Sequence, residues 1–208
     1  MLQIIPALLV AITVVIQCLA VQMSRYRLSR MNARPPHHGL ALMSGMLAAA
    51  AIILRLYQND SAVGVLFMTI MTGCMTLMPL TDAASCRLPR PFTIMYLISG
   101  SAFRLWQGDW LTGLCSAGFW FLLLLLFRQY TSYRRKTETI GLGDVFLIAG
   151  IAIWSPPGDI PWIVATAAGG ALLYLWCNRQ RRITRELPFG PFLCASQYAF
   201  TFYPGGLW

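Results

Sequence analysis

The sequence predicts an all-α fold, a bundle of about eight transmembrane helices with both termini on the periplasmic side. Of its 208 residues, 57% are hydrophobic and only 11% are charged, and a water-soluble domain would have difficulty keeping so many apolar side chains off its surface. The apolar residues also fall into long runs separated by short polar or basic stretches. We expect residues 1–208 to form a single integral-membrane domain.

Each expected span is one of these apolar runs. In chain order the runs cover residues 2–20, 39–57, 63–80, 92–106, 111–127, 141–154, 160–177 and 189–203. Most are long enough to cross about 30 Å of hydrocarbon at about 1.5 Å per residue. The fourth, sixth and eighth runs are of marginal length, so the expected count of spans includes three short members.

The positions of the basic residues predict how the spans are oriented. Lys and Arg concentrate in cytoplasmic loops, whereas Asp and Glu contribute little to orientation. Of the 16 basic residues, all except Arg55 and Arg104 follow the first, third, fifth and seventh runs. These loops are therefore expected in the cytoplasm, the longest covering about 21–38. If the short sixth run did not cross the membrane, the arginine cluster at 179–185 would lie on the periplasmic side. We therefore expect this run to cross, with local thinning of the bilayer.

The net charge of +9 does not indicate nucleic-acid binding. The basic residues are distributed over four loops that orient the spans, and no loop interleaves them with stacking aromatic residues. We therefore expect membrane lipids with anionic headgroups, and no nucleic acid, as their partners. The six cysteines are scattered without the C-x-x-C spacing of a zinc site, so we also expect no metal.

Two aspartates are the strongest candidates for a functional site. Asp82 ends the third apolar run and Asp144 begins the sixth, so both are expected at the cytoplasmic ends of their helices. A carboxylate at the end of a membrane helix is costly to keep, which favours a functional role. Asp144 could instead be a helix N-cap, but Asp82 lies at the helix end where the dipole disfavours an anion. A purely structural role is therefore harder to assign to Asp82.

A pair of carboxylates can hydrolyse a peptide bond without a metal ion or a nucleophilic Ser or Cys. Mutual repulsion and partial desolvation raise the pKa of one acid, while the other stays ionised. The ionised acid takes a proton from the attacking water, and the protonated acid supports the oxyanion and later protonates the amine. Gly141 and Gly143 would let a peptide backbone approach. We expect both carboxyls to face one cleft, with these glycines and the turn at 188–191 nearby.

Three motifs in this chain resemble those of a known family. Gly141-Leu142-Gly143-Asp144 resembles the GxGD signature of intramembrane aspartic proteases. The stretch from Asp82 to Leu88-Pro89 is similar to the first-aspartate region of bacterial type IV prepilin peptidases. Pro188-Phe189-Gly190-Pro191 closely resembles the Pro-Phe-Gly-Pro element near the C-terminus of those enzymes. The three elements also occur in the order that the family has.

The resemblance implies a multi-pass aspartic endopeptidase of the bacterial inner membrane. Such an enzyme cuts the short basic leader from prepilins or pseudopilins at the cytoplasmic face, just before the hydrophobic helix of the mature subunit. By this likeness Asp82 and Asp144 are the catalytic pair, and the supporting residues are Gly141, Gly143, Pro188, Phe189, Gly190 and Pro191. The last four residues are also compatible with a simple helix-entry turn, because Pro is well tolerated near a helix start.

The chain departs from the family pattern at two places. Many relatives carry a Cys-rich insertion after the first span and also methylate the new N-terminal amine, whereas this chain has only the short stretch 21–38 there. We therefore expect no cofactor, with S-adenosylmethionine needed only if methyl transfer is retained. Many relatives also have Lys two residues after the second aspartate, where this chain has Phe146.

Two other classes of function compete with the protease. The first is a non-catalytic scaffold within a pilus or secretion assembly, and the presence of both aspartates argues against it. The second is a small ion-coupled transporter, which predicts ionisable residues in the central parts of the spans. Those parts contain no Asp, Glu, Lys, Arg or His. The sequence predicts no particular oligomeric state.

Overall fold

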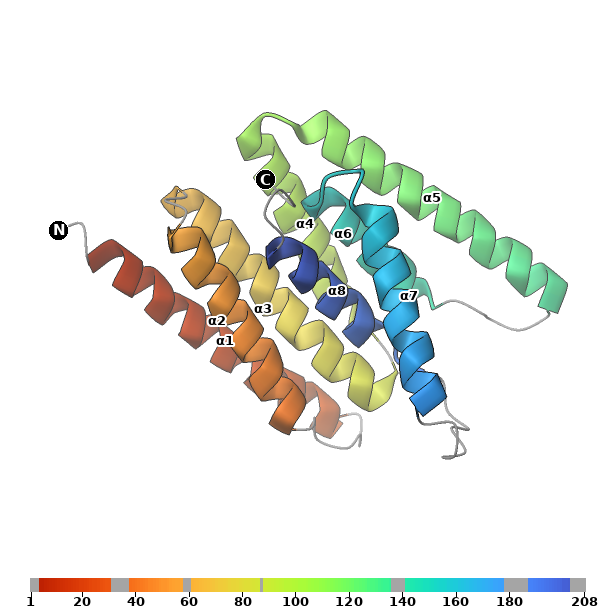
Figure 1. Cartoon of the computed structure of the whole chain (residues 1–208), viewed down its shortest axis with the longest axis horizontal. Helices are drawn as coiled ribbons and strands as arrows, with labels where there is room; N and C mark the ends of the chain where they lie inside the picture. The colour runs from red at the N-terminus through yellow and green to blue at the C-terminus, as the bar shows by residue number, and fades with distance from the viewer. Residues whose placement is uncertain are drawn as a thin grey trace.

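The computed structural model describes residues 4–30, 38–57, 61–86, 88–135, 141–177 and 187–202. Within these ranges the chain forms eight α-helices and no β-strand, so the all-α prediction is confirmed. The helices are α1 (Ile4–Arg30), α2 (His38–Tyr57), α3 (Ala62–Ser85), α4 (Arg90–Gln107), α5 (Trp110–Arg135), α6 (Leu142–Trp154), α7 (Ile160–Cys177) and α8 (Gly190–Phe202). Successive helices run in opposite directions, so that α1 begins and α8 ends at the same end of the bundle (Figure 1).

Helices α1 and α5 extend furthest beyond the apolar runs that predicted them. Helix α1 continues to Arg30 and α5 to Arg135, so the expectation of a loop from residue 21 was wrong. Neither extension contains Gly or Pro, and a helix that is already nucleated continues through residues such as Arg, Leu and Gln at little cost. Several basic residues of the orientation argument therefore lie on helices. Others, namely Arg34, Arg87, Lys136 and the cluster at 179–185, fall outside the described residues.

Helix α3 is the central helix of the bundle. It contacts α1, α2, α4 and α8, and every residue from Met71 to Asp82 is buried. A helix that is covered on all sides must be apolar all round, and the few polar side chains of α3 find partners in its neighbours or in its own backbone. Gln17 of α1, for example, donates a hydrogen bond of 3.2 Å from Nε2 to Oγ1 of Thr72. Such interhelical hydrogen bonds are typical of packed membrane helices.

Three of the described helices, α3, α5 and α7, are long and apolar enough to cross a membrane. Helix α6 has 13 residues and is about 20 Å long, shorter than the hydrocarbon layer. Large apolar side chains of α5 and α7, such as Phe127 and Trp162, are more than half exposed. Exposed apolar surface of this extent is expected where lipid covers a protein. The chain thus has the helices of a membrane protein.

Close packing against α4 sets the position of α6. The indole Nε1 of Trp154 donates a hydrogen bond of 3.1 Å to the carbonyl oxygen of Tyr96 on α4. A Cβ at Gly150 would lie 2.5 Å from Cδ1 of Tyr96, and one at Gly100 would lie 2.7 Å from Nε1 of Trp154. Each glycine therefore makes room for an aromatic ring of the other helix.

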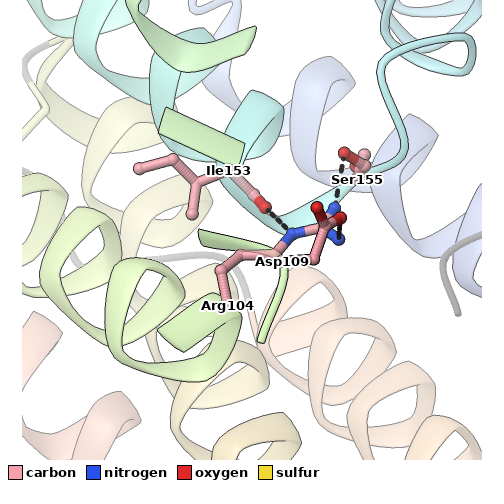
Figure 2. A network of polar contacts seen from close by, with 4 residues as sticks. All are labelled: Arg104, Asp109, Ile153 and Ser155. Carbon is pink, nitrogen blue, oxygen red and sulfur yellow. Dashed lines mark hydrogen bonds and ion pairs between the residues drawn. The ribbon is translucent and has the colours of Figure 1, made fainter. Parts of the chain in front are cut away.

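A buried arginine holds the C-terminal end of α6 (Figure 2). Arg104 of α4 donates from Nε to the carbonyl oxygen of Ile153 at 2.8 Å and from Nη2 to that of Ser155 at 3.0 Å. Its Nη1 lies 3.4 Å from Oδ2 of Asp109. The last carbonyls of a helix lack partners within the helix, and a cation is favourable at that end. Arg104 therefore anchors the helix that carries Asp144 at the end far from the aspartate.

We expect Arg104→Met to destabilise the protein by about 2–4 kcal/mol. The change leaves the carbonyls of Ile153 and Ser155 without their donor, and each buried acceptor left unpaired costs about 1–3 kcal/mol. The midpoint of thermal unfolding in detergent should fall by roughly 5–15 °C. The control is Arg134→Met, because the exposed Arg134 guanidinium contacts the ring of Tyr130 and should contribute about 1 kcal/mol or less. Equal shifts in the two variants would contradict an anchoring role for Arg104.

Candidate active site

Asp82 lies in the last turn of α3 and is only 4% exposed. Its backbone carbonyl accepts a hydrogen bond of 2.7 Å from the amide of Cys86, which has a φ of 50°. This is the arrangement of a left-handed C-cap, and it is costly for a residue other than glycine. The end of α3, and with it the position of Asp82, is therefore fixed by a specific cap one turn after the aspartate.

The carboxylate of Asp82 contacts the first residue of α8. The amide of Gly190 donates a hydrogen bond of 2.9 Å to Oδ2 of Asp82. The N-terminus of a helix has free N–H groups and a partial positive charge, which favour an anion. Asp82 is at the unfavourable end of its own helix, but α8 supplies a favourable end beside it. A Cβ at Gly190 would lie 2.7 Å from the same oxygen, so the contact requires glycine at this position.

The Pro-Phe-Gly-Pro element forms the entry to α8. The carbonyl of Phe189 accepts hydrogen bonds from the amides of Phe192 at 3.1 Å and Leu193 at 3.2 Å. Pro191 lies in the first turn, where a missing N–H is tolerated. The interpretation of this element as a helix-entry turn is confirmed. Through Gly190 the same turn also contacts one of the two candidate aspartates.

Asp144 lies in the first turn of α6, and the N-cap of this helix is Gly141. The interpretation of Asp144 as the N-cap was therefore wrong. A Cβ at Gly141 would lie 3.2 Å from Oδ2 of Asp144, closer than most real contacts. A Cβ at Gly143 would lie 2.8 Å from Cβ of Leu88, so this glycine lets the connection between α3 and α4 approach α6. Both glycines thus occupy positions where a side chain would crowd the site.

The two aspartates border one cavity of about 760 Å³. Gly141 and Gly143 also line it, and its walls include Cys86, Thr93, Phe121 and Leu125. Helices α3 and α6 have no backbone contact in the described part of the chain, whereas α4 and α8 each contact both of them. Asp82 and Asp144 thus border one cavity, as expected of a pair that acts on the same bond. The 188–191 turn lies near Asp82 but does not line this cavity. Gly190 of the turn contacts Asp82, and the side chain of Phe189 packs against the main hydrophobic core.

Several lining residues were not singled out as site residues from the sequence. Phe121 and Leu125 belong to the uniform apolar run of α5, in which no local signal distinguishes one face from another. The ring of Phe121 lies 5.3 Å from that of Phe146, between centroids, and both rings border the cavity. Phe146, noted above only as a departure from the family pattern, is therefore part of an aromatic wall beside Asp144.

This arrangement suits acid and base chemistry on a bound molecule. Two carboxyl groups that share a partly buried cavity repel each other when both are ionised, which favours a state with one proton on the pair. The cavity has both polar and apolar walls and is large enough for an extended segment of several residues. Within the described ranges, no three His, Cys, Asp or Glu side chains come together as a metal-binding group.

Comparison with known proteins agrees with the motifs. The profile of the type IV leader peptidase family matches residues 69–176, a segment that contains both aspartates. Two curated proteins named "Prepilin leader peptidase/N-methyltransferase", from Burkholderia pseudomallei strains 1026b and K96243, are each 33% identical to this chain over 175 residues. The matched region covers 79% of this chain and 53% of each relative, so the chain spans about half the length of these relatives. No solved structure matches the chain. Because the family profile covers about half of the sequence, the chain belongs to the type IV leader peptidase family.

Proposed function

We propose that this protein is an aspartic endopeptidase that removes the leader from type IV prepilins or pseudopilins. Membership of the leader peptidase family and the names of the relatives support leader processing. The observation that carries the aspartic mechanism is the shared cavity. Asp82 and Asp144 come from helices without backbone contact, yet both border the same space. This is the arrangement that a pair of carboxyls needs in order to act on one bond.

We assign the general base to Asp82 and the general acid to Asp144. The amide of Gly190 donates to the Asp82 carboxylate, and such a bond stabilises an ionised carboxylate more than a neutral acid. Asp82 takes a proton from a water molecule as the water oxygen attacks the peptide carbonyl. Asp144 supports the developing oxyanion. Asp144 then gives its proton to the leaving amine as the C–N bond breaks. Transfer of a proton from Asp82 to Asp144 restores the starting state.

The proposed reaction is peptide cleavage, by one integral-membrane domain of residues 1–208. Water is the nucleophile and two carboxyls move the protons, so the step requires neither a metal ion nor an organic cofactor. The names of the relatives also include N-methyltransferase. That second activity would need S-adenosylmethionine as methyl donor.

The test of this function is cleavage by the purified protein. The wild-type chain, reconstituted in lipid vesicles with a prepilin, should release the leader, and mass spectrometry of the product should show one new N-terminus. Chelators and serine reagents should leave the rate unchanged, and so should cysteine reagents when Cys86, which borders the cavity, is replaced by Ser. Intact prepilin after prolonged incubation would instead favour a non-catalytic scaffold that retains the fold.

We further propose that the cavity opens to the cytoplasmic side of the bacterial inner membrane. Cys86 borders the cavity beside Asp82 and is partly exposed, so its thiol provides a natural probe. In a variant that retains only this cysteine, a membrane-impermeant maleimide should modify the thiol in inverted vesicles and leave it unmodified in intact spheroplasts. The same variant with Cys86→Ser is the control. Modification only from the periplasmic side would contradict the proposed orientation.

A further inference from the structure

A second cavity adjoins the one bordered by Asp82 and Asp144, which we call the catalytic cavity. It has a volume of about 590 Å³ and lies between α4, α5 and α6, with walls that are almost entirely apolar. We refer to it as the α4–α5–α6 groove. Phe121 and Phe146 line both the catalytic cavity and the groove, so the two spaces share this pair of rings as a common wall.

The groove continues the faces of the helices that line the catalytic cavity. On α5 the series begins at Leu125 in the catalytic cavity and continues at steps of three or four residues through Phe121 and Gly118 to Leu114 in the groove. On α6 it runs from Phe146 through Ala149 to Ile153. Residues at this spacing lie on one face of a helix. From Phe146 to Ile153 the groove extends about 10 Å away from Asp144, or two helical turns. It therefore leads from the aspartates into the apolar part of the bundle.

Near Ile153, at the far end of the groove, Arg104 joins the three helices that form it. Ile153 lines the groove, and its carbonyl accepts the hydrogen bond from Arg104 (Figure 2). A Cβ at Gly113 of α5 would lie 2.9 Å from Cγ of Arg104, so α5 also packs on this arginine. Arg104 thus brings the three helices together at one end, and the groove between them is a fixed feature of the fold.

The middle of the groove is formed by small residues. Ser101, Ala102, Ala117, Gly118 and Ala149 all belong to its lining. Small side chains allow another helix to approach closely in a membrane, where packing replaces the hydrophobic effect as the source of association. At Gly118 a Cβ would have no neighbour within 4 Å, so the space beside this residue is open.

We propose that the α4–α5–α6 groove holds the apolar helix of the prepilin that follows the cleaved bond, while the catalytic cavity holds the bond itself. This inference rests on the proposed function, because the substrate of that reaction passes directly from the scissile segment into an apolar helix. When the scissile bond lies between Asp82 and Asp144, the first turns of that helix must leave the catalytic cavity. The groove is apolar, adjoins that cavity at the shared rings of Phe121 and Phe146, and has small residues in its lining.

The first test fills the groove at Gly118. We expect Gly118→Phe to lower kcat/KM for a full-length prepilin by about tenfold or more, mainly through KM, because a phenyl ring would occupy the space of the substrate helix. Cleavage of a short peptide that contains the leader and the scissile bond, but not the apolar helix, should be unchanged. The matched control is Gly169→Phe on α7, where a Cβ also has no neighbour within 4 Å and which does not line the groove. Equal rates on prepilin for both variants would overturn the proposal.

The second test measures occupancy without cleavage. A photoreactive phenylalanine analogue is placed at residue 118 or 169 in the Asp144→Asn variant, which is then mixed with prepilin in lipid vesicles. Crosslinks from residue 118 to the apolar helix of the prepilin, without crosslinks from residue 169, would support the proposal. Crosslinks from residue 118 only to lipid, or only to a second copy of this chain, would overturn it. If the wild-type protein failed to cleave prepilin and residue 118 still captured the helix, the proposed function would fail and the groove assignment would stand.

Discussion

Asp82→Asn and Asp144→Asn should each lower the rate of leader cleavage by about 10²–10⁴-fold, because each removes one member of the acid and base pair. The change has little effect on volume. The amide oxygen of asparagine can still accept the hydrogen bond from the amide of Gly190, so the Asp82→Asn protein should keep the contact between α3 and α8. Loss of activity would then report the chemistry of the carboxyl and not a loss of folding. The rate is measured with purified protein and prepilin.

The control for this pair is Asp109→Asn. Asp109 is the aspartate beside Arg104, its side chain is half exposed, and an amide oxygen can still accept from the guanidinium. We expect this variant to cleave at a rate close to that of the wild type. If Asp82→Asn or Asp144→Asn also cleaved at such a rate, the two aspartates would not be the catalytic pair.

Gly190→Ala has the second largest expected effect. The added Cβ would lie 2.7 Å from Oδ2 of Asp82, so either the carboxyl or the start of α8 must move. A shift of about 1 Å in a reacting group can cost about 10²-fold in rate, and we expect a loss of that size in kcat. The hydrogen bond from residue 190 to Asp82 should also weaken. Cleavage assays together with thermal unfolding would separate this local shift from general destabilisation.

The matched control for Gly190→Ala is Gly170→Ala. A Cβ at Gly170 would lie 3.4 Å from Cδ1 of Phe192, which is at the edge of ordinary contact. Gly170 lies on α7, which packs against α8, but it does not line the catalytic cavity. We therefore expect near wild-type cleavage from Gly170→Ala. Wild-type cleavage by Gly190→Ala would show that the close approach of residue 190 to Asp82 has no part in the reaction.

The helices themselves were predictable because their signals are local. The predicted run 160–177 has the same bounds as α7, and α6 begins one residue later than predicted and ends where predicted. Pro156, Pro157 and Gly158 lie between these two helices, and a Pro-Pro-Gly run is a strong local signal for the end of a helix. The ends of α1 and α5 were missed for a related reason. Leaving an apolar run does not end a helix when the residues that follow are good helix formers.

The sequence by itself determined the all-α fold and singled out Asp82 and Asp144, because apolar runs, helix breakers and a costly charge can be recognised from neighbouring residues alone. The tertiary structure decided how those residues are used. The contact between Gly190 and Asp82 joins positions 108 residues apart, and the aromatic wall of Phe121 and Phe146 joins α5 to α6. In the sequence Arg104 was one of only two basic residues outside the loops that orient the spans, and in the fold it holds the end of α6. These contacts depend on which helix faces which, and that choice is made by side-chain packing across the whole bundle.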